Sequence, residues 1–231
     1  MNAKLFSVVI LSAVVLLIYP AQIWAADSNM VAAKDTNSPA EIKNIELPKP
    51  QMDGGKPLMT ALKERKTSRA FSSEWLPLQV ISNMLWAADG INRPDGKRTA
   101  PTAMNKQEID VYVAMEEGLY LYDAKANKLI CILAEDIRAV TGKQPFVKEA
   151  PINLIFVADY AKMGDGPAEQ KDFYAAIDTG YISQNVYLYC ASEGLATVVR
   201  GYLDKPACQA AMKLRSDQKI IVAQTVGYPK K

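Results

Sequence analysis

Three segments of this sequence carry groups that could hold a small anionic ligand. The first is Arg65–Arg69 (RKTSR), where three cations and two hydroxyls fall within five residues. Guanidinium groups bind phosphate oxygens in a bidentate manner, and hydroxyls add hydrogen bonds. The segment follows a predicted helix, so a solvated helix end whose cations complement the helix dipole explains the same pattern. The residues alone leave both interpretations open.

The second and third segments offer backbone groups more than charge. Residues 98–105 (RTAPTAMN) place small residues beside Pro101, which allows backbone amides to approach a flat ligand, and Arg98 adds a cation. Residues 193–198 (EGLATV) form a glycine turn after a long predicted helix. An ordinary loop before a strand and a glycine helix stop explain these two patterns as well.

Composition excludes several kinds of chemistry. The 231 residues include no histidine and only three cysteines, none in CxxC spacing. Imidazole-based nucleophile pairs, imidazole zinc sites and dithiol redox centres are therefore excluded. The sequence has 27 basic and 25 acidic residues, a formal charge of +2, which argues against nucleic-acid binding. Chemistry must come from backbone, Arg and Lys, hydroxyls, carboxylates or a bound cofactor, and no metal site is expected.

Residues 1–25 match a secretory signal peptide. Lys4 precedes an apolar run over residues 5–18, Pro20 breaks it, and a cut after Ala25 fits. The run of about 14 apolar residues is short for the ~20 that a membrane span needs. We therefore expect cleavage and export to the periplasm or the medium, with no stable membrane span afterwards. An uncleaved N-terminal membrane anchor is the alternative.

The predicted export affects whether the three cysteines form a disulfide. An oxidising compartment allows one disulfide and one remaining thiol. Their apolar surroundings instead favour buried free thiols at Cys131, Cys190 and Cys208.

Hydrophobic patterning predicts one α+β domain over residues 57–231, preceded by a polar linker or wrapping arm over residues 26–56. We expect helices from about residue 57 and over 77–89, 136–141, 171–193 and 206–214. Strands are expected over 108–115, 119–123, 129–133, 150–158 and 219–226, with a short apolar step over 197–199. Together they predict a mostly antiparallel sheet with helices on its faces.

Individual positions within these elements carry further predictions. The apolar run over residues 150–158 (APINLIFVA) is typical of a strand buried on both faces. Gly90 and Gly194 are expected to end two helices. The apolar side of the helix over 77–89 comprises Leu78, Ile81, Leu85 and Trp86, and that of the long helix includes Phe173, Ile177, Ile182, Val186 and Leu188.

The order of the segments resembles the FMN-dependent nitroreductase family, over about residues 57 to 229. A basic R-[KR]-[ST]-x-R segment followed by Phe opens the pattern. The pieces that follow in order are Met84–Gly90 (MLWAADG), Arg98–Ala103 (RTAPTA), the EIDVYV strand, the GLYLYD hairpin, Gln184-Asn185, the EGLAT turn and VGYP near the end. The combination is most similar to the branch that contains the SagB/ThcOx-type azoline-forming dehydrogenases.

This resemblance implies an interlocked α+β homodimer with FMN in each interface and residues from both subunits. By position, Arg65, Lys66, Thr67 and Arg69 hold the phosphate and ribityl chain, and Lys230 completes the phosphate site. Arg98, Pro101, Thr102, Ala103 and Asn105 bind or line the isoalloxazine, and Leu195, Ala196 and Thr197 approach it from the other side. The resemblance assigns no catalytic side chain, since the cofactor carries the hydride chemistry.

Three functions follow as hypotheses. The first is an exported FMN-dependent oxidoreductase, in which a small-molecule donor and then a nitroaromatic, quinone or similar flat acceptor bind in turn by a ping-pong route. The second is a non-catalytic flavin- or ligand-binding protein on the same fold. The third is a structural envelope protein whose basic segment only solvates a helix end.

Overall fold

The structure is a computed structural model that describes residues 43–231. The predicted signal peptide lies outside the described residues, as does the first part of the predicted linker. The helices are α1 (Leu58–Glu64), α2 (Leu78–Asp89), α3 (Phe146–Glu149), α4 (Ala168–Glu193) and α5 (Lys205–Ala211). The strands are β1 (Ile45–Glu46), β2 (Ile109–Met115), β3 (Gly118–Asp123), β4 (Lys128–Leu133), β5 (Ile152–Asp159), β6 (Ala196–Arg200) and β7 (Gln218–Gly227). Short 3-10 turns cover Ala103–Asn105, Arg138–Thr141 and Tyr160–Met163.

The described strands form one sheet in the order β1-β4-β3-β2-β5-β7-β6, and every neighbouring pair is antiparallel. This confirms the predicted α+β class and the mostly antiparallel sheet. All eight residues of β5 are buried, as the apolar run predicted. β5 lies between β2 and β7, so it has hydrogen-bonded neighbours on both edges and packed layers on both faces.

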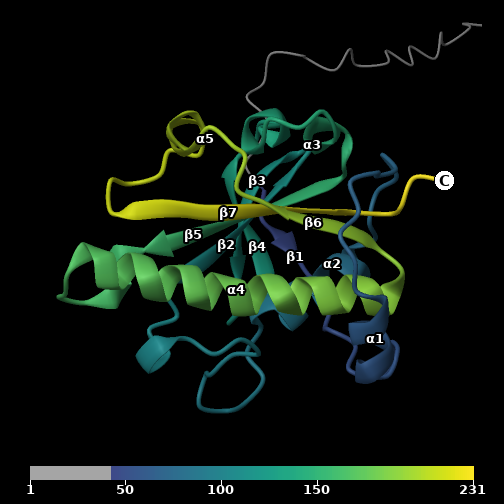
Figure 1. Ribbon diagram of the computed structural model, residues 1–231, viewed down its shortest axis with the longest axis horizontal. Coiled ribbons are helices and arrows are strands. Elements are labelled where there is room, and N and C mark those ends of the chain that lie inside the picture. The colour runs from purple at the N-terminus through teal and green to yellow at the C-terminus, as the bar shows by residue number, and fades with distance from the viewer. Residues whose placement is uncertain (1–42) are drawn as a thin grey trace, which may run out of the picture. The chain divides into compact units, whose positions relative to one another are not determined.

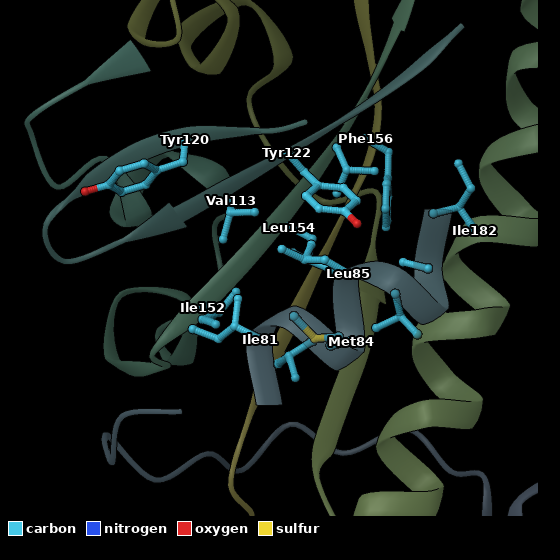
Figure 2. Close-up of a cluster of buried hydrophobic side chains, with 14 of the residues drawn as sticks. Ile81, Met84, Leu85, Val113, Tyr120, Tyr122, Ile152, Leu154, Phe156 and Ile182 are labelled. Atoms are coloured by element: carbon cyan, nitrogen blue, oxygen red, sulfur yellow. The ribbon is translucent and has the colours of Figure 1, made fainter. Parts of the chain in front are cut away.

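Helices cover both faces of the sheet. α2 and α4 pack on one face, while α5 and the segment around α3 lie on the other (Figure 1). Side chains alternate along a strand, so Leu154 and Phe156 enter the core beneath α2 and α4, and Ile155 and Val157 enter the opposite core. Figure 2 shows Leu85 of α2 beside Leu154. Burying one such side chain contributes about 1.5–3 kcal/mol.

Several boundaries differ from the predicted ones. α4 begins at Ala168, three residues earlier than expected, because Pro167 takes the N-cap position and its ring is compatible with a helix start. α5 begins at Lys205 and ends at Ala211, because Asp204 caps its first turn and Lys213 has a positive φ. The expected helix over 136–141 is a 3-10 turn over Arg138–Thr141.

Two of the predicted apolar faces are partly wrong. Phe173 and Ile177 of α4 are exposed, although Ile182 and Val186 are buried as predicted. On α2, Leu78 is exposed. These residues fit the apolar periodicity, but they extend beyond the edge of the core of this chain. An exposed apolar face on a long helix is a feature of surfaces that contact another body.

Gly90 ends α2 for a reason other than left-handed backbone. Its φ is −75°, which any residue adopts. A Cβ at this position would lie 2.4 Å from the ring of Trp86. The indole of Trp86 instead closes over the helix end and donates from Nε1 to the Ile91 carbonyl at 3.1 Å.

Residues 43–56 run along the domain and bond to it at several points. β1 pairs with β4, Asn127 Nδ2 donates to the Pro48 carbonyl at 3.0 Å, and Gln51 N–H donates to Asn83 Oδ1 at 2.9 Å. At the end of this stretch, Lys56 N–H donates to Ser192 Oγ at 2.8 Å and so ties it to α4.

All three cysteines are free thiols. Cys190 and Cys208 are buried, and burial raises the pKa of both, that of Cys208 to about 11. Cys131 is only partly buried. Free thiols agree with the second of the two cysteine predictions. Within residues 43–231, no helix is both long and apolar enough to cross a membrane.

Candidate cofactor-binding site

Backbone hydrogen bonds fix the basic segment against the edge strand β6. α1 ends at Glu64, and Arg65 already has non-helical backbone angles. The chain then runs extended beside β6, where Ser68 N–H donates to the Thr197 carbonyl at 2.9 Å. The C-terminal tail closes the other side, since Lys230 N–H donates to the Ala70 carbonyl at 3.2 Å. The basic segment is therefore held in one conformation rather than left as a frayed helix end.

Tyr187 of α4 joins this segment to β6 and α4. Its hydroxyl accepts a hydrogen bond from Val199 N–H at 3.1 Å and lies 3.0 Å from Thr67 Oγ1. Its ring centroid lies 5.3 Å from the guanidinium carbon of Arg65, a cation–π distance. Tyr187 is 7% exposed. One side chain thus positions both a hydroxyl and a cation of the predicted phosphate site.

A cavity of about 580 Å³ opens where these elements meet. It is lined by Lys56, Lys63, Glu64, Arg65, Lys66, Ser68, Tyr187, Cys190, Ala191, Gly194, Leu195, Ala196, Thr197 and Pro229. We call it the basic cavity. Lys56 Nζ lies 2.7 Å from Glu64 Oε2, which lowers the pKa of that carboxyl. Within residues 43–231, Lys63, Arg65 and Lys66 form no ion pair, so the cavity keeps a positive excess.

The glycine turn forms one wall of the basic cavity. Gly194 caps α4 with φ 71°, as the sequence predicted, and Leu195 N–H donates back to the Cys190 carbonyl at 2.8 Å. Thr197 is buried, and its hydroxyl donates to the Thr225 carbonyl at 2.9 Å. The turn can therefore offer a ligand backbone and the Leu195 side chain, but not the Thr197 hydroxyl.

The segment over residues 98–107 lies elsewhere. Arg98 is engaged within the protein, since Nη1 lies 2.6 Å from Asp89 Oδ2 and Nε donates to Gln107 Oε1 at 2.9 Å. Burial raises the pKa of Asp89 to about 7 against the opposing effect of Arg98. Arg98 therefore secures this segment to the end of α2 through Nε and Nη1, and only Nη2 has no partner among the described residues.

Residues 103–107, which we call the strained turn, have an unusual backbone. Met104, Asn105 and Gln107 all have φ near +50°, a conformation that costs non-glycine residues about 1–2 kcal/mol each. Hydrogen bonds hold the turn, because Gln107 N–H donates to Thr102 Oγ1 at 3.0 Å and Ala103 N–H donates to Asp178 Oδ2 at 2.9 Å. Such strain persists where surrounding contacts enforce it, and it concentrates at functional sites.

The two parts of the predicted flavin site are far apart within one chain. The strained turn contacts α4 at Asp178, whereas the basic cavity contacts it from Tyr187 to Gly194. From Asp178 to Cys190 the helix rises about 18 Å. Figure 1 shows α1 beside the C-terminal end of α4. The structure brings Arg65, Lys66, Leu195, Ala196 and Thr197 together, and it does not bring Pro101–Asn105 to them.

Two predicted phosphate ligands lie at the margin of the basic cavity. Arg69 is exposed and lines none of the cavities described here. Lys230 lines a neighbouring and larger cavity of about 1020 Å³ that shares Gly194 and Pro229 with the basic one. The larger cavity mixes Glu116, Glu149 and Glu193 with basic residues. Its carboxylates make it a poorer place for a phosphate, despite its volume.

The donor set of the basic cavity suits FMN. Lys63, Arg65 and Lys66, which form no ion pair within residues 43–231, match a phosphate dianion. The Ser68 hydroxyl matches a ribityl chain, and the Leu195 side chain offers an apolar wall to a flat ring. The described residues contain no group of three or more Cys, Asp or Glu side chains arranged to hold a metal ion.

Comparison with known proteins identifies the family of this chain. The model of the nitroreductase family matches residues 62–228. The chain belongs to the nitroreductase family. The matched stretch includes the strained turn and the whole basic segment, and the antiparallel sheet with its helices is the nitroreductase fold.

Individual relatives agree. The crystal structure of a protein described as a putative nitroreductase from Ralstonia eutropha JMP134 is 42% identical with a TM-score of 0.78, covering 81% of this chain and 90% of that one. A Methanocaldococcus jannaschii protein of the same description is 32% identical over 154 residues, 62% of this chain and 78% of the relative. The iodotyrosine deiodinase of Nematostella vectensis is 28% identical over 180 residues, 74% of this chain and 66% of the relative.

Sequence reasoning missed several residues of this site. Lys56 falls in the stretch interpreted as linker, and Lys63 lies inside a predicted helix, so neither showed a motif. Tyr187 lies inside the predicted long helix, where no motif marks it. Its position seven residues before Gly194 places it about two turns from the helix end, which is the signal that could have linked it to the glycine turn.

The contacts of Tyr187 predict a stability effect. Tyr187→Phe removes the acceptor of Val199 N–H and should lower the free energy of unfolding by about 1–3 kcal/mol. Denaturant unfolding measures this, and amide hydrogen exchange should show faster exchange at Val199. Tyr202→Phe, at an exposed tyrosine, is the control and should change neither. Equal behaviour of the two variants would show that the Tyr187 hydroxyl holds nothing in place.

Proposed function

We propose that this protein is an exported FMN-dependent oxidoreductase that passes electrons from a small-molecule donor to a nitroaromatic, quinone or similar flat acceptor, by a ping-pong route. The basic cavity carries the proposal. It joins three unpaired cations to a glycine turn in a chain that belongs to the nitroreductase family. On the order of its motifs, we place the protein nearest to the SagB-type branch. Residues 104–107 (MNKQ) replace that branch's Tyr-Pro, so azoline formation is not part of the proposal.

Each side chain has a defined task in this proposal. Lys63, Arg65 and Lys66 neutralise the phosphate, and Tyr187 keeps Arg65 and Thr67 in position. The bound flavin supplies the redox chemistry, so no titratable side chain has to act in electron transfer. The residues of this chain would bind and orient the flavin, and the proposed ping-pong route requires one face of its ring to stay open to reactants.

We further propose that the working unit is a homodimer, because one chain cannot complete the site. Packing α4 against a second α4, antiparallel and with the two-fold axis near Gln184, would place the strained turn of one chain beside the basic cavity of the other. Gln184 is midway between Asp178 and Cys190 and is exposed. The two parts are about 18 Å apart along α4 within one chain. In the antiparallel pair, each part would instead lie opposite the complementary part of the other chain.

The exposed face of α4 fits this packing. Phe173, Ile177 and Tyr181 recur every four residues and are exposed. Gly180 lies on the same face, in the helix interior, where glycine costs about 1 kcal/mol relative to alanine. A Cβ at Gly180 would meet nothing within 4 Å. No contact within residues 43–231 explains this glycine, whereas close approach of a second helix would.

Binding of FMN is tested directly. The purified protein should show a flavin absorbance spectrum after incubation with FMN, and the flavin should be reduced and then reoxidised by a quinone or nitroaromatic compound. A protein that takes up no FMN contradicts the proposal. Bound flavin that no such acceptor reoxidises supports the alternative of a non-catalytic binding protein.

The phosphate contact predicts a specific loss. Arg65→Ala should weaken FMN binding about tenfold or more, because a charged hydrogen bond contributes about 1.5–3 kcal/mol. Arg93→Ala, at an exposed arginine of the loop after α2, is the matched control and should bind FMN normally. Fluorescence titration measures both. Equal affinities of the two variants would place the phosphate outside the basic cavity.

If α4 packs against a second α4, a larger residue at Gly180 should stabilise the helix but weaken the dimer. Gly180→Leu should raise the helical propensity of α4 by up to about 1 kcal/mol and yet shift the protein from dimer to monomer in sedimentation velocity. Gly201→Leu is the control, at another glycine with open space around its Cβ, in the loop after β6. A Gly180→Leu protein that stays dimeric would exclude the proposed packing of α4.

A further inference from the structure

We propose that Glu108 and Asp178 share one proton at neutral pH, and that this protonated pair positions the strained turn. Only the predicted effect of this pair on flavin binding rests on the proposed function. The two carboxyl groups themselves belong to one chain. Glu108 immediately follows the strained turn and precedes β2, while Asp178 lies on α4 beneath the turn. Both residues are positioning residues, because neither is placed to touch a substrate.

The first observation is a buried carboxyl group with no donor. Glu108 is 0% exposed, and within residues 43–231 no nitrogen or hydroxyl donates to either of its side-chain oxygens. A bare carboxylate in that position would cost several kcal/mol. The carboxyl that acts on it is that of Asp178, which is itself only 2% exposed. A proton on one of the two is the hydrogen bond that the site allows.

The second observation is a hydrogen bond from the strained turn to Asp178. Its Oδ2 accepts from Ala103 N–H at 2.9 Å, the first residue of the strained turn. A carboxylate that accepts one hydrogen bond from Glu108 and another from Ala103 is held at a fixed orientation. The pair thereby anchors a turn in which Met104, Asn105 and Gln107 all have left-handed backbone angles.

The surrounding charges support a shared proton. From α4 the group facing Glu108 is Asp178, and from the turn over Tyr160–Met163 it is Lys162, which lies 2.5 Å from Asp110 Oδ1 and is engaged there. Burial and then Asp178 raise the pKa of Glu108 to about 7, against the opposing effects of its own backbone N–H and of Lys162. The raised value agrees with the contacts, because an unprotonated pair would be two interacting carboxylates, and the cation that acts on Glu108, Lys162, is engaged by Asp110.

Loss of the proton should release the turn. Two facing carboxylates repel, and Asp178 can relieve the repulsion by rotating away from Glu108 and from Ala103 N–H. The strained backbone then loses one of its restraints. In the proposed dimer this turn lines the flavin of the other subunit, so FMN affinity should fall as pH rises through about 7.

Stability without flavin tests the pair itself. The folded-state pKa of Glu108 is raised above its unfolded value, so its stabilising contribution is complete at about pH 4.5 and is lost as pH rises to about 7. Thermal unfolding of the apo-protein should therefore show a melting temperature that falls over this range. Glu108→Gln, which keeps a donor toward Asp178 but does not titrate, should remove part of that fall.

Two further variants isolate the effect. Asp89→Asn removes the other buried carboxyl whose pKa is raised to about 7, so its contribution can be subtracted. Glu117→Gln makes the same acid-to-amide change at an exposed hairpin residue and should match the unmodified protein. A Glu108→Gln profile parallel to the unmodified one overturns the proposal. If Glu108→Gln does not fold, carbon-13 NMR of the unmodified protein decides, since a Glu108 carboxyl that titrates near pH 4.5 overturns it too.

Flavin affinity tests the consequence. The dissociation constant of FMN should rise above about pH 7, by up to about tenfold per pH unit, and Glu108→Gln should remove this rise. An equal rise in both proteins would overturn the positioning role. If no FMN binds at any pH, the proposed function fails, while the apo-protein profiles still confirm or overturn the shared proton.

Discussion

One helix fixes both parts of the proposed site. α4 holds the basic segment through the Tyr187 hydroxyl and holds the strained turn through the Asp178 carboxylate. Its buried face packs on the sheet beneath it, so neither contact can shift without moving the helix relative to β7 and α2. The rise of the helix between the two contacts keeps the parts about 18 Å apart in one chain. The proposal that a second chain completes the site rests on that distance.

The basic cavity and the strained turn differ in the charges that surround them. The basic cavity keeps a positive excess, because its one carboxylate, Glu64, pairs with Lys56. The strained turn lies over buried carboxyls, among them Glu108 and Asp89. A ligand with a phosphate at one end and a flat, weakly polar ring at the other matches such an arrangement. Its phosphate would occupy the cavity, while its ring would extend toward a turn held by proton-dependent contacts.

The sequence predicted the fold better than the site. The continuous apolar run over residues 150–158 and the glycine at residue 194 identified a doubly buried strand and a helix end, since both depend on local pattern. The role of Arg98 could not be read in this way, because its partner Asp89 is set by how α2 ends against the loop. The exposure of Phe173 likewise depends on where the core stops, which periodicity along one helix does not encode.

The central claim is that each flavin site combines the basic cavity of one chain with the strained turn of another. Mixed dimers of an Arg65→Ala chain and an Asn105→Ala chain test it most directly. If the claim is correct, one of the two sites carries both substitutions and the other carries neither, so the mixed dimer should bind one FMN with unmodified affinity. If each site lies within a single chain, both sites carry one substitution, and a mixed dimer without any high-affinity FMN would contradict the account.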